Sequence, residues 1–156
     1  MTRAIEVDGL LIAHGSPDPR HAVALRRLAA QVADAVAPMA CHIAFLDHDE
    51  PPLSDWIESR QHLRLRAIGL LLSSGYHARV DIPRALESAT DVEDLGTLGS
   101  GEWLPPVLER NVADVGETPE SPVVLVAAGS TEVSARADLV AASDLWQASR
   151  PGRVLT

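Results

Sequence analysis

Short apolar runs alternate with helix-like stretches along almost the whole chain. The apolar runs predict strands at residues 7–13, 41–46, 65–72, 92–95, 123–127 and 153–156. Apolar residues at helical spacing predict helices from Pro19 to about Pro38, after Pro51-Pro52, and at residues 81–89, 105–115 and 133–148. This alternation is typical of parallel strands in a layered α/β fold. We therefore expect an α/β fold in which a parallel four-stranded sheet is flanked by helices.

One sequence pattern occurs twice. Residues 10–16 (LLIAHGS) align with residues 124–130 (VLVAAGS), and each copy precedes an amphipathic helical stretch. Between the copies, residues 116–122 are polar and rich in proline and glycine, which is typical of a linker. We therefore expect one lobe at residues 1–115, a linker at 116–122, and the start of a second, incomplete lobe at 123–156. The hypothesis is that a two-lobed chain is truncated here.

The composition argues against several classes of protein. The chain has 156 residues, a net charge of −9 and one cysteine, so it cannot form an intramolecular disulfide. It has no basic run for nucleic-acid phosphates and no GxxxxGK[ST] pattern for a nucleotide. No apolar run reaches the roughly 20 residues of a membrane span, and the first residues lack the apolar stretch of a signal peptide. We expect a soluble, cytoplasmic protein that binds neither nucleic acid nor membrane.

Three side chains that can bind metals follow three successive predicted strands. His14 comes directly after the first strand, Asp47 directly after the second, and His77 lies in the loop after the third. Ligands of open parallel sheets bind outside the carboxyl ends of the strands, where these residues should meet. Two imidazoles and a carboxylate suit a divalent first-row metal such as iron or cobalt. Each residue alone is more often a hydrogen-bonded loop residue, and His48 is more often a solvated loop histidine than a further ligand.

The residues beside these three also fit a binding site. Gly15 and Ser16 allow a ligand to approach the backbone closely, and their amides near a helix N-terminus could bind an anion. Arg79 and Arg84 follow His77 and could pair with substrate carboxylates. The alternatives stay open: a tight strand-to-helix turn for Gly15-Ser16, and a solvated surface for the two arginines.

Three segments resemble motifs of the sirohydrochlorin chelatases, the class II chelatases that make sirohaem or the cobalt precursor of vitamin B12. The segments are residues 11–20 (LIAHGSPDPR), 44–53 (AFLDHDEPPL) and 70–83 (LLLSSGYHARVDIP). Residues 95–99 together with Arg110 resemble the end of the family's first lobe. The resemblance covers nearly the whole chain in order, and it implies a flavodoxin-like chelatase lobe.

The resemblance implies roles for individual residues. His14 and His77 would be the metal-binding and catalytic histidines. Asp47 would stand where the family usually has a glutamate that assists at the metal. The shorter side chain of Asp47 leaves open whether it binds the metal directly or acts through water or another ligand. The residues in contact with the tetrapyrrole would be Gly15, Ser16, Tyr76 and Arg79.

The second copy of the repeat fits one form of this family. Long forms have two similar lobes, of which the second lacks the metal histidines, whereas short forms dimerise. Ala128 stands in the second copy where His14 stands in the first. The chain therefore resembles a long form with an incomplete second lobe. Whether two chains associate as a homodimer stays open.

The activity implied by the resemblance is the insertion of Fe²⁺ or Co²⁺ into sirohydrochlorin, in sirohaem or cobalamin biosynthesis. The metal and the tetrapyrrole would be the partners, and no nucleotide would take part. A protein that binds tetrapyrrole or metal without turnover is an alternative. A hydrolase that uses the His-Gly turn is a weaker alternative, because the chain has no G-x-S-x-G nucleophile motif.

Overall fold

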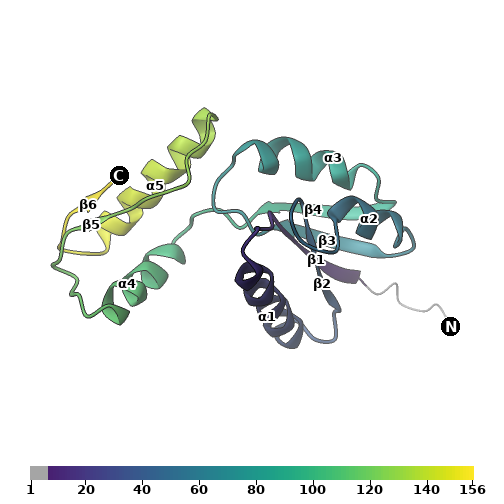
Figure 1. The fold of residues 1–156 in the computed structure, drawn as a ribbon, viewed down its shortest axis with the longest axis horizontal. Coiled ribbons are helices and arrows are strands. Elements are labelled where there is room, and N and C mark those ends of the chain that lie inside the picture. Colours follow the sequence, from purple (N-terminus) through teal and green to yellow (C-terminus); the bar gives the residue numbers. More distant parts are fainter. Residues whose placement is uncertain (1–6) are drawn as a thin grey trace. The chain divides into compact units, whose positions relative to one another are not determined.

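The computed structural model describes residues 7–156, which form two compact units. Unit 1 comprises residues 7–71 and 76–98, and unit 2 comprises residues 72–75 and 99–156. Figure 1 shows the helices and strands of both units. Within the described part of the chain, no helix is both long and apolar enough to cross a membrane.

Unit 1 is built on a parallel sheet with the strand order β2-β1-β3-β4. Its strands are β1 (Val7–Ala13), β2 (Cys41–Phe45), β3 (Arg64–Gly69) and β4 (Asp91–Thr97). Its helical elements are α1 (Pro19–Ala35), α2 (Leu53–Glu58), the π-helical turn η1 (His77–Asp81) and α3 (Ile82–Leu86). The prediction of an α/β fold with a parallel four-stranded sheet flanked by helices is therefore confirmed.

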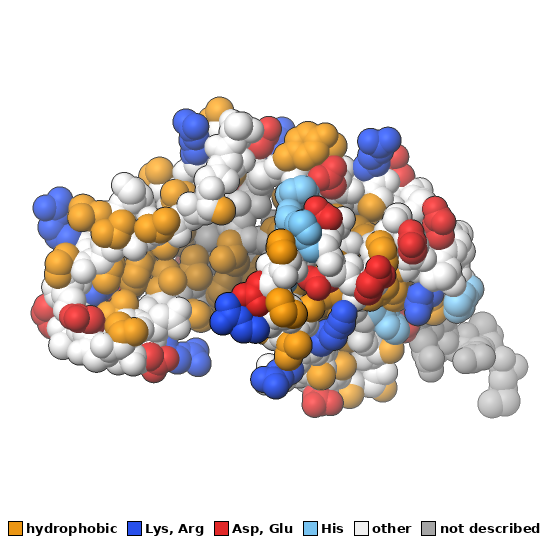
Figure 2. Space-filling model, in the orientation of Figure 1, with side chains coloured by type: hydrophobic (Ala, Val, Ile, Leu, Met, Phe, Trp, Pro, Cys, Tyr) orange, Lys and Arg blue, Asp and Glu red, His pale blue; other side chains and the backbone are white. Residues whose placement is uncertain are grey.

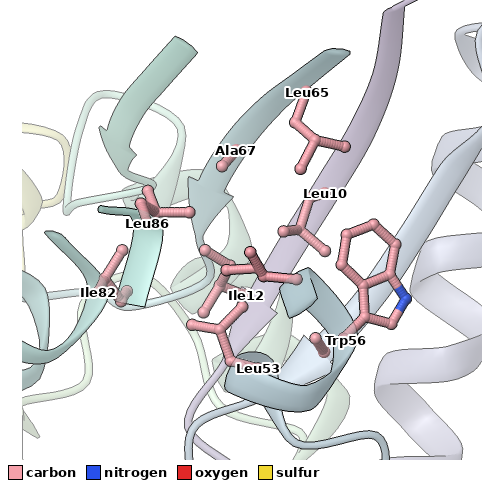
Figure 3. Packing of buried hydrophobic residues seen from close by; sticks show 10 residues of the cluster. Leu10, Ile12, Leu53, Trp56, Leu65, Ala67, Ile82 and Leu86 are labelled. Carbon is pink, nitrogen blue, oxygen red and sulfur yellow. The ribbon is translucent and has the colours of Figure 1, made fainter. Parts of the chain in front are cut away.

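The core of unit 1 lies on both faces of the sheet, because successive residues of a strand point to opposite faces. Leu10 and Ile12 of β1 pack in a buried cluster with residues of α2 and α3. Figure 3 shows this cluster, with Leu53 and Trp56 from α2, Leu65 and Ala67 from β3, and Ile82 and Leu86 from α3. Ala13 packs on the other face with Ala22 of α1 and Phe45 of β2. Figure 1 accordingly shows α2 and α3 on one side of the sheet and α1 on the other.

Two predicted strands end three residues earlier in the structure than in the sequence pattern. The apolar run at 65–72 stays in the sheet only to Gly69, with one further hydrogen bond from the Leu70 amide to the Ile12 carbonyl (2.6 Å). The strand predicted at 123–127 pairs only over Val123–Val124, since its partner strand is equally short. In both cases apolarity alone overestimated the strand, because a strand also requires a backbone partner along its length.

Unit 2 contains two helices and a short parallel sheet. Its elements are α4 (Leu104–Asp114), β5 (Val123–Val124), α5 (Val133–Ala148) and β6 (Val154–Leu155). The side chain of Arg150 is fully buried in this unit. Its guanidinium donates hydrogen bonds to the carbonyls of Pro119 (3.1 Å) and Ser121 (2.8 Å) and lies 3.2 Å from the carboxylate of Glu109. Arg150 therefore ties the turn that precedes β5 to α4.

Replacing Arg150 by methionine should destabilise unit 2 strongly. The change removes the buried cation beside the Glu109 carboxylate and the donor to the Ser121 carbonyl, and breaking a buried ion pair from one side costs about 3–5 kcal/mol. The free energy of unfolding measured in urea should fall by that amount. Arg153→Met is the matched control, because Arg153 is exposed, and it should change stability by less than about 0.5 kcal/mol. Equal effects of the two substitutions would contradict this account of Arg150.

Candidate functional site

The carboxyl ends of β1 and β3 bring two histidines together in unit 1. His14 is the first residue after β1, and His77 begins η1 after the loop that follows β3. Their Nε2 atoms lie 3.0 Å apart, and the two rings meet edge to face with their centroids 4.5 Å apart. Both side chains are partly exposed to solvent. Figure 2 shows histidine side chains grouped with acidic side chains beside them on the displayed face.

The hydrogen-bond partners of the two rings assign their tautomers. His14 Nδ1 lies 3.0 Å from the carbonyl oxygen of Gly15, and His77 Nδ1 lies 2.6 Å from the carboxylate of Asp81. Carbonyl and carboxylate oxygens only accept, so each Nδ1 carries the hydrogen and donates it. In the neutral rings both Nε2 atoms then carry lone pairs. Two facing lone pairs repel each other, and a cation between them relieves that repulsion.

The distance between the two Nε2 atoms suits a shared metal ion. An imidazole nitrogen binds a metal such as zinc at about 2.0–2.1 Å, and two such nitrogens at right angles are then about 3.0 Å apart. The observed separation is 3.0 Å. The pair therefore has the spacing of two adjacent ligands of one metal ion.

The carboxylate of Asp47 does not join the two histidines in this structure. The Asp47 amide donates to the His14 carbonyl (2.8 Å), which places the backbones of the two loops side by side. Its side chain is 64% exposed and accepts instead from the His48 amide (2.8 Å). Among residues 7–156, no group of three His, Cys, Asp or Glu side chains is arranged to hold a metal ion. The role of Asp47 at the metal therefore stays a prediction.

Gly15 lies where the two loops come closest. Its φ is +93°, and a Cβ built on it would lie 1.7 Å from the carbonyl oxygen of Asp47. A side chain at this position is therefore excluded both by the backbone conformation and by the neighbouring backbone. Glycine allows the loop after β1 to pass the loop after β2, and this places His14.

The amide of Ser16 already has a partner within the protein. It donates to the carboxylate of Asp49 (3.0 Å), while the Ser16 hydroxyl accepts from the Asp18 amide (3.1 Å). Asp18 is the N-cap of α1, and its hydrogen bonds with Arg20 hold the pKa of the Asp18 carboxyl below its usual value. The predicted binding of a ligand anion by the Ser16 amide would thus require Asp49 to be displaced.

The remaining predicted residues lie around His77. Tyr76 is 55% exposed and its ring meets the His77 ring edge to face, with centroids 6.4 Å apart. Arg79 lies within η1, two residues after His77, and Arg84 is exposed on α3. The ring centroid of His48 is 6.3 Å from that of His14. His48 therefore lies near the pair, but farther from His14 than His77 does.

Two residues of the site were missed by the sequence analysis. Asp81 was interpreted only as a helix start, although its spacing of four residues from His77 would place both on one helical face. Asp49 follows Asp47 in an acidic segment, and nothing in the spacing distinguishes the carboxylate that holds a backbone amide from the one that is exposed.

The family of this chain follows from a match over most of its length. Residues 8–115 match the model of the CbiX family, and the chain belongs to this family. The family resemblance found in the sequence motifs is therefore confirmed. No curated protein sequence matches the chain significantly.

Two solved structures share the fold closely. "SirB from Bacillus subtilis with Fe3+" superimposes with a TM-score of 0.82 at 20% sequence identity, over 96% of this chain and 64% of the solved one. The sirohydrochlorin chelatase SirB from Bacillus subtilis subspecies spizizenii in complex with cobalt gives a TM-score of 0.81 at 21% identity, over 96% and 66% of the two chains. The chain thus spans slightly less than two thirds of the length of each of these proteins.

Proposed function

We propose that this chain inserts a divalent metal, Fe²⁺ or Co²⁺, into sirohydrochlorin. The observation that carries the proposal is that the Nε2 atoms of His14 and His77 lie 3.0 Å apart, while the Nδ1 atom of each ring donates its hydrogen to an oxygen on the other side. Membership of the CbiX family supports the proposal, as do the iron and cobalt named with the two similar solved structures. The metal is a substrate here, and no nucleotide is required.

The two histidines can supply both binding and proton uptake. Insertion places one M²⁺ in the macrocycle and releases two pyrrole N–H protons. A neutral imidazole nitrogen can hold the metal or accept a proton, but it cannot do both at once. When His14 and His77 pass the metal to the macrocycle, their two Nε2 atoms become free. These two atoms then accept the two protons, so charge and protons balance without a further base.

The other predicted residues have proposed roles around this exchange. Asp47 would assist the metal through its charge, by water or by a change of side-chain rotamer. Gly15 keeps the backbone next to His14 free of side-chain atoms. Tyr76, Arg79 and the Ser16 amide would contact the tetrapyrrole, whose carboxylates need arginines in a chain with a net charge of −9.

The wider setting is part of the same proposal. We place the reaction in sirohaem or cobalamin biosynthesis in the cytoplasm, with sirohydrochlorin and a divalent metal as partners. Residues 1–115 would form the metal-binding lobe, residues 116–122 a linker, and residues 123–156 the start of a second lobe. Association of two chains as a homodimer is also part of the proposal, and analytical ultracentrifugation of the chain tests it.

An insertion assay tests the proposed activity. Under anaerobic conditions, the chain should speed the spectral change from sirohydrochlorin to its Co²⁺ or Fe²⁺ complex above the rate without protein. A spectral shift of bound sirohydrochlorin without formation of the metal complex would instead indicate a protein that binds the tetrapyrrole without turnover. Running both metals side by side also shows which of the two is inserted faster.

A further inference from the structure

Asp81 holds the outer nitrogen of His77. Its carboxylate lies 2.6 Å from His77 Nδ1, whereas the Nε2 atom of the same ring faces His14. We infer that Asp81 is a positioning residue, which fixes the tautomer and the ring orientation of His77 so that the Nε2 lone pair faces the metal. This inference rests on the proposed function for its purpose, although the tautomer itself can be tested without any assay of insertion.

The chemistry of metal-bound histidine supports this role. A histidine that binds a metal through one nitrogen usually donates its other N–H to a carboxylate or a carbonyl, which sets the tautomer and orients the ring. Without such an acceptor, the hydrogen of a neutral imidazole can move to Nε2 and block the metal-binding position. The Asp81 carboxylate is the acceptor that prevents this exchange at His77.

The two histidines of the pair are held by different means. His14 donates to a neutral backbone carbonyl at 3.0 Å, whereas His77 donates to a charged carboxylate at 2.6 Å. Hydrogen bonds to ionised acceptors are shorter and about twice as strong as neutral ones. The orientation of His77 therefore depends on a side chain that can be replaced, while that of His14 depends on the backbone.

The turn that carries Asp81 is itself well anchored. The amide of Ile82 donates to the His77 carbonyl, which closes the π-helical turn between the two residues. Ile82 is 2% exposed and packs against β3 so closely that a Cβ on Gly69 would lie 2.9 Å from its Cδ1. The backbone of Asp81 is thus fixed by its buried neighbour, and its carboxylate is only partly buried. Substituting the carboxylate should leave the fold intact.

Nitrogen NMR of the metal-free chain tests the tautomer directly. In ¹⁵N-labelled protein, the neutral ring of His77 in the wild type should carry its hydrogen on Nδ1. Asp81→Ala should shift His77 towards the tautomer with the hydrogen on Nε2. Asp81→Asn keeps an oxygen acceptor and should largely retain the wild-type tautomer. Glu87→Gln, which removes an exposed carboxylate shortly after α3, is the matched control and should change nothing.

The affinity for Co²⁺ provides the second readout. Titration of the full chain with Co²⁺ should show binding about 10–100-fold weaker in Asp81→Ala than in the wild type, the range seen when such partners of metal ligands are removed. Asp81→Asn should lie between the two, and Glu87→Gln should equal the wild type. The inference is wrong if Asp81→Ala keeps the Nδ1 hydrogen on His77, or binds Co²⁺ within twofold of the wild type. If the tautomers and the Co²⁺ affinities are as expected but the wild-type chain inserts no metal, the proposed function is contradicted. The positioning role of Asp81 then still stands.

Discussion

Replacing His14 and His77 together by alanine should abolish Co²⁺ binding and metal insertion while the chain stays folded. The variant removes both Nε2 atoms, which are the metal ligands and the proton acceptors of the proposed exchange. Positioned acid–base groups alone contribute about 10²–10⁴-fold to a rate, so insertion should fall below about 1% of the wild-type rate. Both side chains are partly exposed at the edge of the sheet, outside the two core clusters, and the circular dichroism spectrum should not change.

A third histidine provides the control for this experiment. His62 is exposed between α2 and β3, and His62→Ala should keep wild-type Co²⁺ affinity and insertion rate. The rates are measured by the absorbance change of sirohydrochlorin, and the affinity by titration calorimetry. Undiminished insertion by the double variant would overturn the assignment of the site.

Gly15→Ala should disrupt the same site through the backbone. The new Cβ would lie 1.7 Å from the Asp47 carbonyl oxygen, in a residue with a φ of +93°, so the loop after β1 must move. The free energy of unfolding should fall by at least about 3 kcal/mol. Because the Gly15 carbonyl accepts the His14 Nδ1 hydrogen, movement of the loop should also weaken Co²⁺ binding.

Gly96→Ala separates the two causes of that effect. Gly96 also has a positive φ, +76°, but a Cβ on it would meet no atom within 4 Å. This substitution should therefore cost only the conformational penalty, about 1–2 kcal/mol, and leave Co²⁺ affinity unchanged. Urea unfolding and Co²⁺ titration of both variants check this. If Gly15→Ala is as stable as Gly96→Ala and binds Co²⁺ normally, the close approach of the two loops does not shape the site.

The sheet and the two histidines could be predicted because their signals are local. A strand segment that is buried on both faces must be apolar, and β1, which is buried from Gly9 to Ala13, occupies residues 7–13 as predicted. His14 and His77 each follow a predicted strand, and in a parallel sheet the carboxyl ends of all strands lie at one edge, so the predicted sheet already places both residues there. The third strand was predicted to run to residue 72 because the chain is apolar up to there, but it ends at Gly69, where its backbone partners end.

The partners of the site residues could not be predicted in this way. Asp47 and Asp49 both follow β2, yet only Asp49 holds the Ser16 amide, while the Asp47 carboxylate is largely exposed. Arg150 resembles any arginine after a helix, and its burial depends on carbonyls of a turn about thirty residues earlier in the chain. Which side chain becomes a hydrogen-bond partner depends on differences of a fraction of an ångström in how segments distant in sequence are placed against each other.

By itself, the sequence determined the α/β class, the family and the edge of the sheet at which two imidazoles meet, because periodicity and motif spacing act along the chain. Only the tertiary structure decided that the two Nε2 atoms lie 3.0 Å apart, that Asp81 and the Gly15 carbonyl hold the outer nitrogens, and that the Asp47 carboxylate points elsewhere. The physical reason is that lone pairs and N–H groups act over about 3 Å. Their partners are therefore chosen by the packing of loops against each other, which no spacing along the chain encodes.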